Sequence, residues 1–359
     1  MTQPLQNLHT DYPWIRTPLV IGAPMRLIAL ADLAVEISKA GGIGFIGAGT
    51  DVSDLATHLE EAKGLLDMAG VKGRDGTLGV GVGFIRYWGA HLPTTLPLLS
   101  HYRPAAAWLF APSTLSSLSD WSTSIRAASP STKLWIQIGS VREARDALLT
   151  AHPDVLVIQG TDAGGHGLSR GAGLITLVPE VADEVDRIVE REKGVRRPVL
   201  VAAGGIVESR SASAAFVLGA SGVVMGTRFL AAREAVVSKG YREEVLRASD
   251  GGQSTVRTKV YDFVRGTTGW AESHNARGVV NRTFEDAVRG MSEEENKRLY
   301  EEEVKKGDEG WGVEGRMTTY AGSGVGLVKE VKYAREIVEE VREGVKGVLG
   351  VIEAGKFEV

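Results

Sequence analysis

The sequence contains no cysteine and no large excess of either charge. The lack of cysteine excludes disulfides, thiolate metal ligands and thiol nucleophiles, and it suits a reducing compartment. The 41 basic and 45 acidic side chains give a formal net charge of −4, which leaves no broad basic surface for a phosphate backbone. Nucleic acid is therefore not expected as a partner.

Long hydrophobic runs are also missing. The first residues include Asp11, Pro13 and Trp14 where a secretion signal needs an uninterrupted apolar core. The longest apolar runs are far shorter than the roughly 20 residues that cross a bilayer, and the final GKFEV matches no retention or peroxisomal signal. We therefore expect a soluble cytoplasmic protein that has no membrane partner.

Glycine and aliphatic residues are plentiful and recur in a regular rhythm. Short runs rich in Val, Ile and Gly alternate with segments of helical spacing, which is typical of parallel βα units. Eight candidate strands cover residues 19–22, 43–47, 78–84, 105–110, 134–138, 155–159, 199–203 and 223–226, with helical segments between them, for example at 31–40, 52–69, 141–149 and 209–218. Eight such units in roughly 235 residues predict a (β/α)8 TIM barrel, whose usual length is about 250 residues. Spacing alone leaves an open, doubly wound sheet as the alternative.

The βα rhythm stops after Glu234. The segment that follows, to about Arg316, is polar and irregular, and we predict that it forms a mostly helical cap. From Leu327 to Leu349, apolar residues three or four apart predict an amphipathic helix that packs back on the barrel. The expected units are a barrel at 14–234, a cap at 235–326 and a C-terminal helical segment at 327–359.

Two glycine-containing turns follow the seventh and eighth candidate strands, and in TIM barrels these turns commonly bind a phosphate group. Gly204 and Gly205 would let main-chain amides approach a phosphate without hindrance from a Cβ atom. Gly226 and Thr227 would add an amide and a hydroxyl. The pattern predicts a mononucleotide cofactor rather than a dinucleotide held in a separate fold. The alternative is that these are ordinary βα turns, in which glycine is common.

A histidine follows the sixth candidate strand. The stretch VIQGTDAGGHGL places His166 directly after Gly164 and Gly165, at the end of the barrel where catalytic residues gather. An imidazole there suits a general base or a group that stabilises an anionic substrate. A loop histidine that bonds only within its own turn is the alternative. No second histidine or carboxylate stands at metal-ligand spacing, so no metal site is predicted.

The first candidate strand ends in IGAPM. Ala23, Pro24 and Met25 would leave the barrel mouth at this point, where their backbone could contact a planar ring. The stretch GGIGFIGAG contains glycines at dinucleotide-binding spacing, but they fall within a strand and no acidic residue follows at the required distance. A Rossmann site is therefore not predicted.

Taken together, these motifs resemble the nitronate monooxygenases, also called 2-nitropropane dioxygenases, a family of FMN-dependent TIM-barrel oxidoreductases. The pieces APM, GGIGFIGAG, QGTDAGGHG, AAGGI and MGTRFLAARE occur in order within about residues 14–234, with a weaker echo in YAGSGVGLV at 320–328. The resemblance implies that Ala23 to Met25 line the flavin ring, that Gln159 lies beside the cofactor and that His166 is the active-site histidine. It also implies a phosphate site formed by Ala202, Gly204, Gly205, Gly226 and Thr227.

Two positions depart from the family pattern. Asp162 stands where the family often has glutamate, and Gly83 stands where an asparagine often bonds the flavin. Gln137 is a candidate to supply that hydrogen bond instead; otherwise the ring would be held more loosely.

The resemblance implies oxidation of alkyl nitronates, or of neutral nitroalkanes, by O₂ to a carbonyl compound and nitrite. Three alternatives remain open: an NAD(P)H-dependent flavin reductase of an enoyl thioester or quinone, a flavin-free lyase or isomerase of a phosphorylated substrate, and a non-catalytic flavin-binding protein. We expect the cap to supply substrate contacts, and its candidates are Tyr261, Trp270, His274, Trp311 and Tyr320.

Overall fold

The computed structural model describes residues 3–85 and 92–353, and its centre is a barrel of parallel strands. The eight strands are β1 (Val20–Gly22), β2 (Phe45–Gly49), β3 (Leu78–Ile85), β4 (Pro104–Phe110), β5 (Lys133–Ile138), β6 (Val155–Gln159), β8 (Val199–Ala203) and β9 (Gly222–Met225). Strand β1 pairs with β9, and a parallel bridge between Ile21 and Ile43 joins it to the chain entering β2. The predicted TIM barrel is confirmed, and the doubly wound alternative is wrong.

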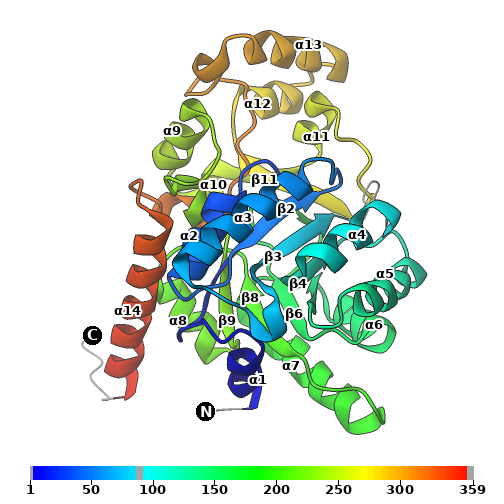
Figure 1. The fold of residues 1–359 in the computed structure, drawn as a ribbon. Helices are drawn as coiled ribbons and strands as arrows, with labels where there is room; N and C mark the ends of the chain where they lie inside the picture. The colour runs from blue at the N-terminus through cyan, green and yellow to red at the C-terminus, as the bar shows by residue number, and fades with distance from the viewer. Residues whose placement is uncertain (1–2, 86–91, 354–359) are drawn as a thin grey trace.

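Helices surround the barrel (Figure 1). They are α2 (Ala31–Lys39), α3 (Leu55–Ala69), α4 (Leu92–Tyr102), α5 (Leu115–Ala128), α6 (Val141–Ala151), α7 (Leu174–Arg191) and α8 (Ser209–Val217). Helix α14 (Ala334–Glu353) packs between α8 and α2 and so takes the eighth place in the ring. Within the described residues, no helix is long and apolar enough to cross a membrane.

The barrel interior is filled by aromatic side chains below the catalytic end. Phe45, Trp108 and Trp135 pack together with ring centroids 5.0–5.9 Å apart. Helix α1 (Gln3–Asp11) leads into Tyr12, whose hydroxyl accepts a hydrogen bond of 2.7 Å from the indole of Trp135. This packing fills the barrel interior on the side away from the cap.

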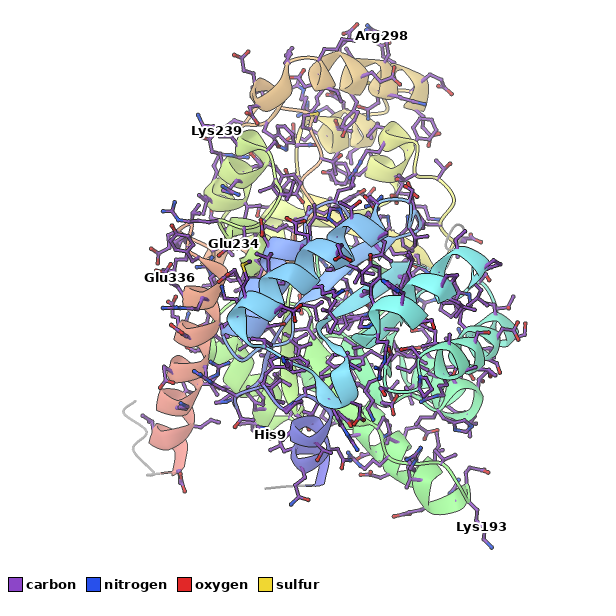
Figure 2. The ribbon with its side chains drawn as sticks, in the orientation of Figure 1. His9, Lys193, Glu234, Lys239, Arg298 and Glu336 are labelled. Carbon is purple, nitrogen blue, oxygen red and sulfur yellow. The ribbon has the colours of Figure 1, made fainter. Side chains whose placement is uncertain are left out.

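The final helix begins later than the sequence indicates. Leu327 ends a short 3-10 helix, η4 (Ser323–Leu327), and α14 starts at Ala334. The Glu234 carboxylate accepts hydrogen bonds from the Ala334 amide at 2.9 and 3.1 Å, and the Glu336 carboxylate accepts one from the Tyr333 amide at 2.8 Å. Both acids lie at the start of α14 (Figure 2), where they satisfy main-chain donors that a helix leaves unpaired.

The cap contains a small sheet in addition to its helices. Its elements are α9 (Lys239–Arg247), α10 (Gly251–Ser254), β10 (Thr255–Thr258), α11 (Val260–Arg265), β11 (His274–Val279), α12 (Arg282–Val288), α13 (Glu293–Val304) and the 3-10 helix η3 (Gly307–Gly310). Strand β11 pairs antiparallel with both β10 and β7 (Gly165–Leu168). Because β7 belongs to the chain between β6 and α7, this sheet fastens the cap to the catalytic end of the barrel.

Candidate active site

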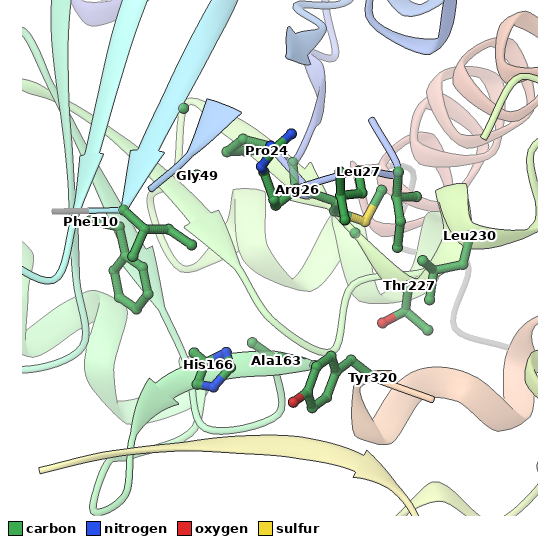
Figure 3. Close-up of a pocket in the computed structure, with 18 of the residues that line it drawn as sticks. Pro24, Arg26, Leu27, Gly49, Phe110, Ala163, His166, Thr227, Leu230 and Tyr320 are labelled. Carbon is green, nitrogen blue, oxygen red and sulfur yellow. The ribbon is translucent and has the colours of Figure 1, made fainter. Parts of the chain in front are cut away.

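A cavity of about 610 Å³ lies at the upper end of the barrel, under the cap. Each of the eight barrel strands, or the residue directly after it, contributes to the wall. The cap supplies further lining, which includes the aromatic side chains of Tyr241, Trp270, Tyr300, Trp311 and Tyr320. In Figure 3, His166 and Tyr320 lie on one side of the cavity, with Pro24 and Arg26 opposite. The volume is within the range of about 300–1,000 Å³ typical of small-molecule and cofactor sites.

The structure brings all but one of the predicted site residues to this cavity. Its lining includes Ala23, Pro24, Met25, Gln137, Gln159, His166, Gly204, Gly205, Gly226 and Thr227. Ala202 is not among the described lining residues: it is fully buried among the side chains packed between the barrel and its helices. Because successive side chains on a strand point to opposite faces, Ala203 faces the interior and lines the cavity in its place.

Three glycine-containing turns meet on one side of the cavity. Gly204 and Gly205 have φ values of +107° and +73°, which non-glycine residues rarely adopt. The Thr227 hydroxyl accepts a hydrogen bond of 2.9 Å from the Gly322 amide, so its own proton remains available to a ligand. Gly324, in the stretch YAGSGVGLV, also lines the cavity. The stretch YAGSGVGLV therefore lies beside the two predicted turns in the cavity wall.

Asp162 supports these turns from behind rather than contacting a ligand. It is not among the described residues that line the cavity. Its carboxylate accepts a hydrogen bond from the Ser323 hydroxyl at 2.7 Å, and its carbonyl accepts one from the Ser323 amide at 3.0 Å. A Cβ atom on Gly322 would lie 2.5 Å from the same carbonyl, which explains the glycine there.

Two arginines of the cap sheet hold the turn that precedes β7. Arg257 donates hydrogen bonds to the carbonyls of Thr161 at 3.0 Å and Ala163 at 2.9 Å. Arg277 donates to the same Thr161 carbonyl at 3.2 Å. Burial is the main cause of a lowered Arg257 pKa, to about 10, so this guanidinium is charged at neutral pH. The cap therefore fixes the backbone that leads to His166.

The glutamines and Gly83 lie near the ring-facing residues predicted from the sequence. The Oε1 atom of Gln137 accepts a hydrogen bond of 3.0 Å from the Trp108 indole, which orients its amide. Gln159 donates to the His166 carbonyl at 3.5 Å. A Cβ atom on Gly83 would lie 2.3 Å from Pro24, so glycine permits the close approach of Pro24.

His166 forms a pair with a buried carboxylate of the cap. It lies in β7, and its Nε2 atom is 2.7 Å from Oδ1 of Asp262 on α11. The Thr267 hydroxyl donates to the same oxygen at 2.9 Å. An ionised carboxylate only accepts hydrogen bonds, so the network assigns the imidazole proton to Nε2 and leaves the Nδ1 lone pair free. Among the described residues, Nδ1 has no hydrogen-bond partner.

Aromatic rings enclose the same imidazole. Trp270 stacks on it with ring centroids 3.9 Å apart and an interplanar angle of 9°, and Tyr320 meets it at 5.5 Å and 61°. Sequence reasoning proposed Trp270 and Tyr320 as cap candidates, and Trp311 also lines the cavity. It missed Asp262, because nothing in the local sequence links a position in YDFVRG to a histidine far earlier in the chain.

The other two cap candidates lie elsewhere. Tyr261 is fully buried and donates its hydroxyl proton to the Val279 carbonyl at 2.6 Å. His274 lines a separate pocket of about 60 Å³ beside the main cavity. Burial is the main cause that lowers the His274 pKa to about 4. His274 is therefore uncharged at neutral pH.

The charged side chains of the main cavity are all potential cations. Within the described residues, its lining includes Arg26, Arg265 and His166 but no carboxylate. Arg265, which sequence reasoning also missed, lies with its guanidinium carbon 5.1 Å from the Tyr320 ring centre. Arg26 pairs with Asp54 at 2.8 Å outside the lining. A cavity of this kind favours anionic ligands over cationic ones.

The chain is similar in sequence to nitronate monooxygenases over most of its length. The sequence pattern of the family "Nitronate monooxygenase" matches residues 123–344, more than half of the chain. The chain is 46% identical over 349 residues to the nitronate monooxygenase npaC of Metarhizium robertsii, covering 96% of this chain and 95% of that protein. It is 36% identical over 367 residues to a nitronate monooxygenase of Neurospora crassa, covering 95% and 93%.

Solved structures share the fold. FabK from Thermotoga maritima superposes with a TM-score of 0.72 at 22% identity, covering 99% of both chains. A nitroalkane oxidase from Streptomyces ansochromogenes superposes with a TM-score of 0.70 at 21% identity, covering 93% of this chain and 98% of that one. At such low identity these two likenesses establish the barrel-and-cap architecture alone.

Proposed function

The chain belongs to the nitronate monooxygenase family, and from this premise we propose that it oxidises alkyl nitronates with O₂ to a carbonyl compound and nitrite. The family consists of flavin-dependent oxidoreductases. The observation that carries the proposal is that three glycine turns and His166, which pairs with Asp262, line one cavity. An alkyl nitronate is a small anion, and the described lining contains cations but no carboxylate.

We infer that the flavin is FMN. The turns at Gly204–Gly205, Gly226–Thr227 and Gly324 form a cradle for one phosphate group, with main-chain amides and the Thr227 hydroxyl as donors. Ala23, Pro24 and Met25 would lie along the ring, and the oriented amide of Gln137 would supply a donor to it. When bound, the flavin supplies the electron transfer between the nitronate and O₂.

In this proposal the residues of the chain bind the substrate and move its proton. His166 contacts the substrate at the end of the cavity covered by the cap, with its free Nδ1 atom as proton acceptor toward a neutral nitroalkane. Toward a nitronate that is already an anion, the same imidazole acts as a hydrogen-bonding and electrostatic partner. The side chains of Trp270 and Tyr320 exclude water from this end.

We further propose that the units 14–234, 235–326 and 327–359 have different roles. The barrel would supply most of the flavin site, with Gly324 at the end of the cap unit completing the phosphate cradle. The rest of the cap would select the substrate, and α14 would complete the helical ring. The partners of this protein would be a small-molecule substrate and O₂.

The proposal is tested by cofactor release and nitrite assays on the purified protein. Heat-released flavin should co-elute with FMN in chromatography, and pre-formed propyl-2-nitronate should yield nitrite in proportion to the O₂ consumed. FAD in the released fraction would refute the cofactor assignment. Turnover of NADPH with an enoyl thioester or quinone, without nitrite from the nitronate, would favour the reductase alternative.

A further inference from the structure

We propose that Asp262 is a positioning residue that fixes the proton of His166 on Nε2 and thereby makes Nδ1 the proton acceptor for neutral nitroalkanes. The inference rests on the proposed function and extends it. It gives the cap a part in proton transfer, whereas the sequence alone suggests that the cap only contacts the substrate.

The environment of Asp262 supports a role beyond folding. Its side chain is only 4% exposed, and within the described residues its sole ionisable partner at ion-pair distance is His166. Both hydrogen bonds to the carboxylate, from His166 and Thr267, go to Oδ1, while Oδ2 is buried and has no partner in the part of the chain that the structure describes. Burying a carboxylate with half of its acceptor capacity unused costs stability. Such costs are expected at functional sites.

The position of the pair also matches the chemistry. His166 lines the cavity, whereas Asp262 does not appear among the described lining residues. The carboxylate therefore acts through the imidazole rather than on the substrate. Thr267 fixes the carboxylate, and Trp270 fixes the plane of the ring by stacking at 3.9 Å.

The step itself is a proton transfer without oxidation. The Cα–H bond of the nitroalkane breaks, and its electron pair forms the C=N bond of the nitronate. The π pair of one N=O bond moves onto that oxygen, which takes the negative charge, and the proton bonds to Nδ1. The resulting imidazolium keeps its Nε2–H bond to the Asp262 carboxylate. Opposite charge at 2.7 Å and the face of Trp270 both stabilise this cation.

The test compares Asp262→Asn with the wild-type holoenzyme on 2-nitropropane and on its pre-formed nitronate. An asparagine amide can rotate and donate to Nε2, which forces the imidazole proton onto Nδ1. The wrong tautomer disables the base, as in a serine-protease triad whose aspartate is replaced by asparagine. We therefore expect nitroalkane turnover to fall by about 10²- to 10⁴-fold, the usual contribution of a general base, with nitronate turnover far less affected. With 2-nitropropane deuterated at C2, this variant should show a larger kinetic isotope effect than the wild type, because the slower proton transfer limits turnover to a greater degree.

Three further variants distinguish a positioning role of Asp262 from a purely structural one. Asp262→Glu restores a carboxylate and should recover part of the nitroalkane activity. Thr267→Val removes the second donor to Oδ1 and should give a smaller loss, again confined to the nitroalkane. Glu244→Gln is the matched control: it removes a buried cap carboxylate that pairs with Arg247 and is not among the described cavity-lining residues, and both activities should be unchanged.

The inference and the proposed function fail in different ways. A flavin-loaded Asp262→Asn enzyme that loses both activities equally, or neither, would overturn the positioning role. If Asp262→Asn does not fold, Thr267→Val without selective loss does the same. A wild-type enzyme that oxidises the nitronate but never the nitroalkane would refute the inference and leave the function intact. A wild-type enzyme inactive on the nitronate would refute the function itself.

Discussion

Adding a side chain at Gly226 should block the phosphate end of the cavity without disturbing the barrel. A Cβ atom built there lies 3.6 Å from Ala23 and 3.9 Å from Met25, which are ordinary contacts. The backbone φ of −108° suits any residue. The methyl groups of Gly226→Val would therefore occupy space that the cradle needs for a phosphate.

The size of the effect follows from the donors that are lost. Displacing the phosphate from one amide and from the Thr227 hydroxyl removes two hydrogen bonds to a charged group, each contributing about 1.5–3 kcal/mol. The sum, about 3–6 kcal/mol, corresponds to a rise of roughly 10²- to 10⁴-fold in the Kd for FMN. The assay is a fluorescence titration of the apoprotein with FMN, with thermal unfolding to confirm that the variant is folded.

A matched control is Gly64→Val, on α3, where a Cβ atom meets nothing within 4 Å and no cavity wall is changed. Gly205→Val is a poorer test, because its φ of +73° and a Cβ position 3.0 Å from Asp162 would strain the fold. Wild-type affinity for FMN in a folded Gly226→Val protein would show that the phosphate lies elsewhere.

Three further predictions concern the imidazoles and the cap. His166→Asn should keep its flavin but lose nitroalkane turnover by about 10²- to 10⁴-fold, the usual range for a general base; equal loss on pre-formed nitronate would instead indicate anion binding. Exchanging residues 240–316 for those of a relative should change the preferred substrate at constant flavin content, since the cradle lies outside this range; an empty flavin site would contradict the division. His274 has a pKa lowered to about 4 in the folded protein, so the stability it contributes is complete above its unfolded value of about 6.5 and is lost as pH falls toward 4. Between pH 7 and pH 5, the free energy of unfolding of His274→Gln should therefore fall by about 2 kcal/mol less than that of the wild type, as measured in urea titrations. Equal falls in the two proteins would refute the assignment.

The barrel was predictable because its strands are buried on both faces. Runs such as VLVIQ and VLVAA are continuous and apolar, and strands β6 and β8 have the predicted boundaries. Strands β7, β10 and β11 were not predictable in the same way. They read GHGL, TVRT and HNARGV, and they pair across long stretches of sequence without an apolar pattern.

The site residues also differ in whether the sequence alone could locate them. Turn glycines and His166 could be located because they directly follow recognisable strands, and the period-two alternation of a strand explains why Ala203 lines the cavity and Ala202 does not. Asp262 could not be located, because its approach to His166 depends on how the cap folds over the barrel. Long-range contacts of this kind leave no local pattern.

Whether the flavin of this protein oxidises an alkyl nitronate is best measured by anaerobic mixing of the purified holoenzyme with the nitronate, followed through the visible absorbance of the flavin. Propyl-2-nitronate should bleach the flavin rapidly, the absorbance should recover when O₂ is admitted, and nitrite should be found in the product. Flavin that stays oxidised with the nitronate but is bleached by NADPH would contradict the proposed function.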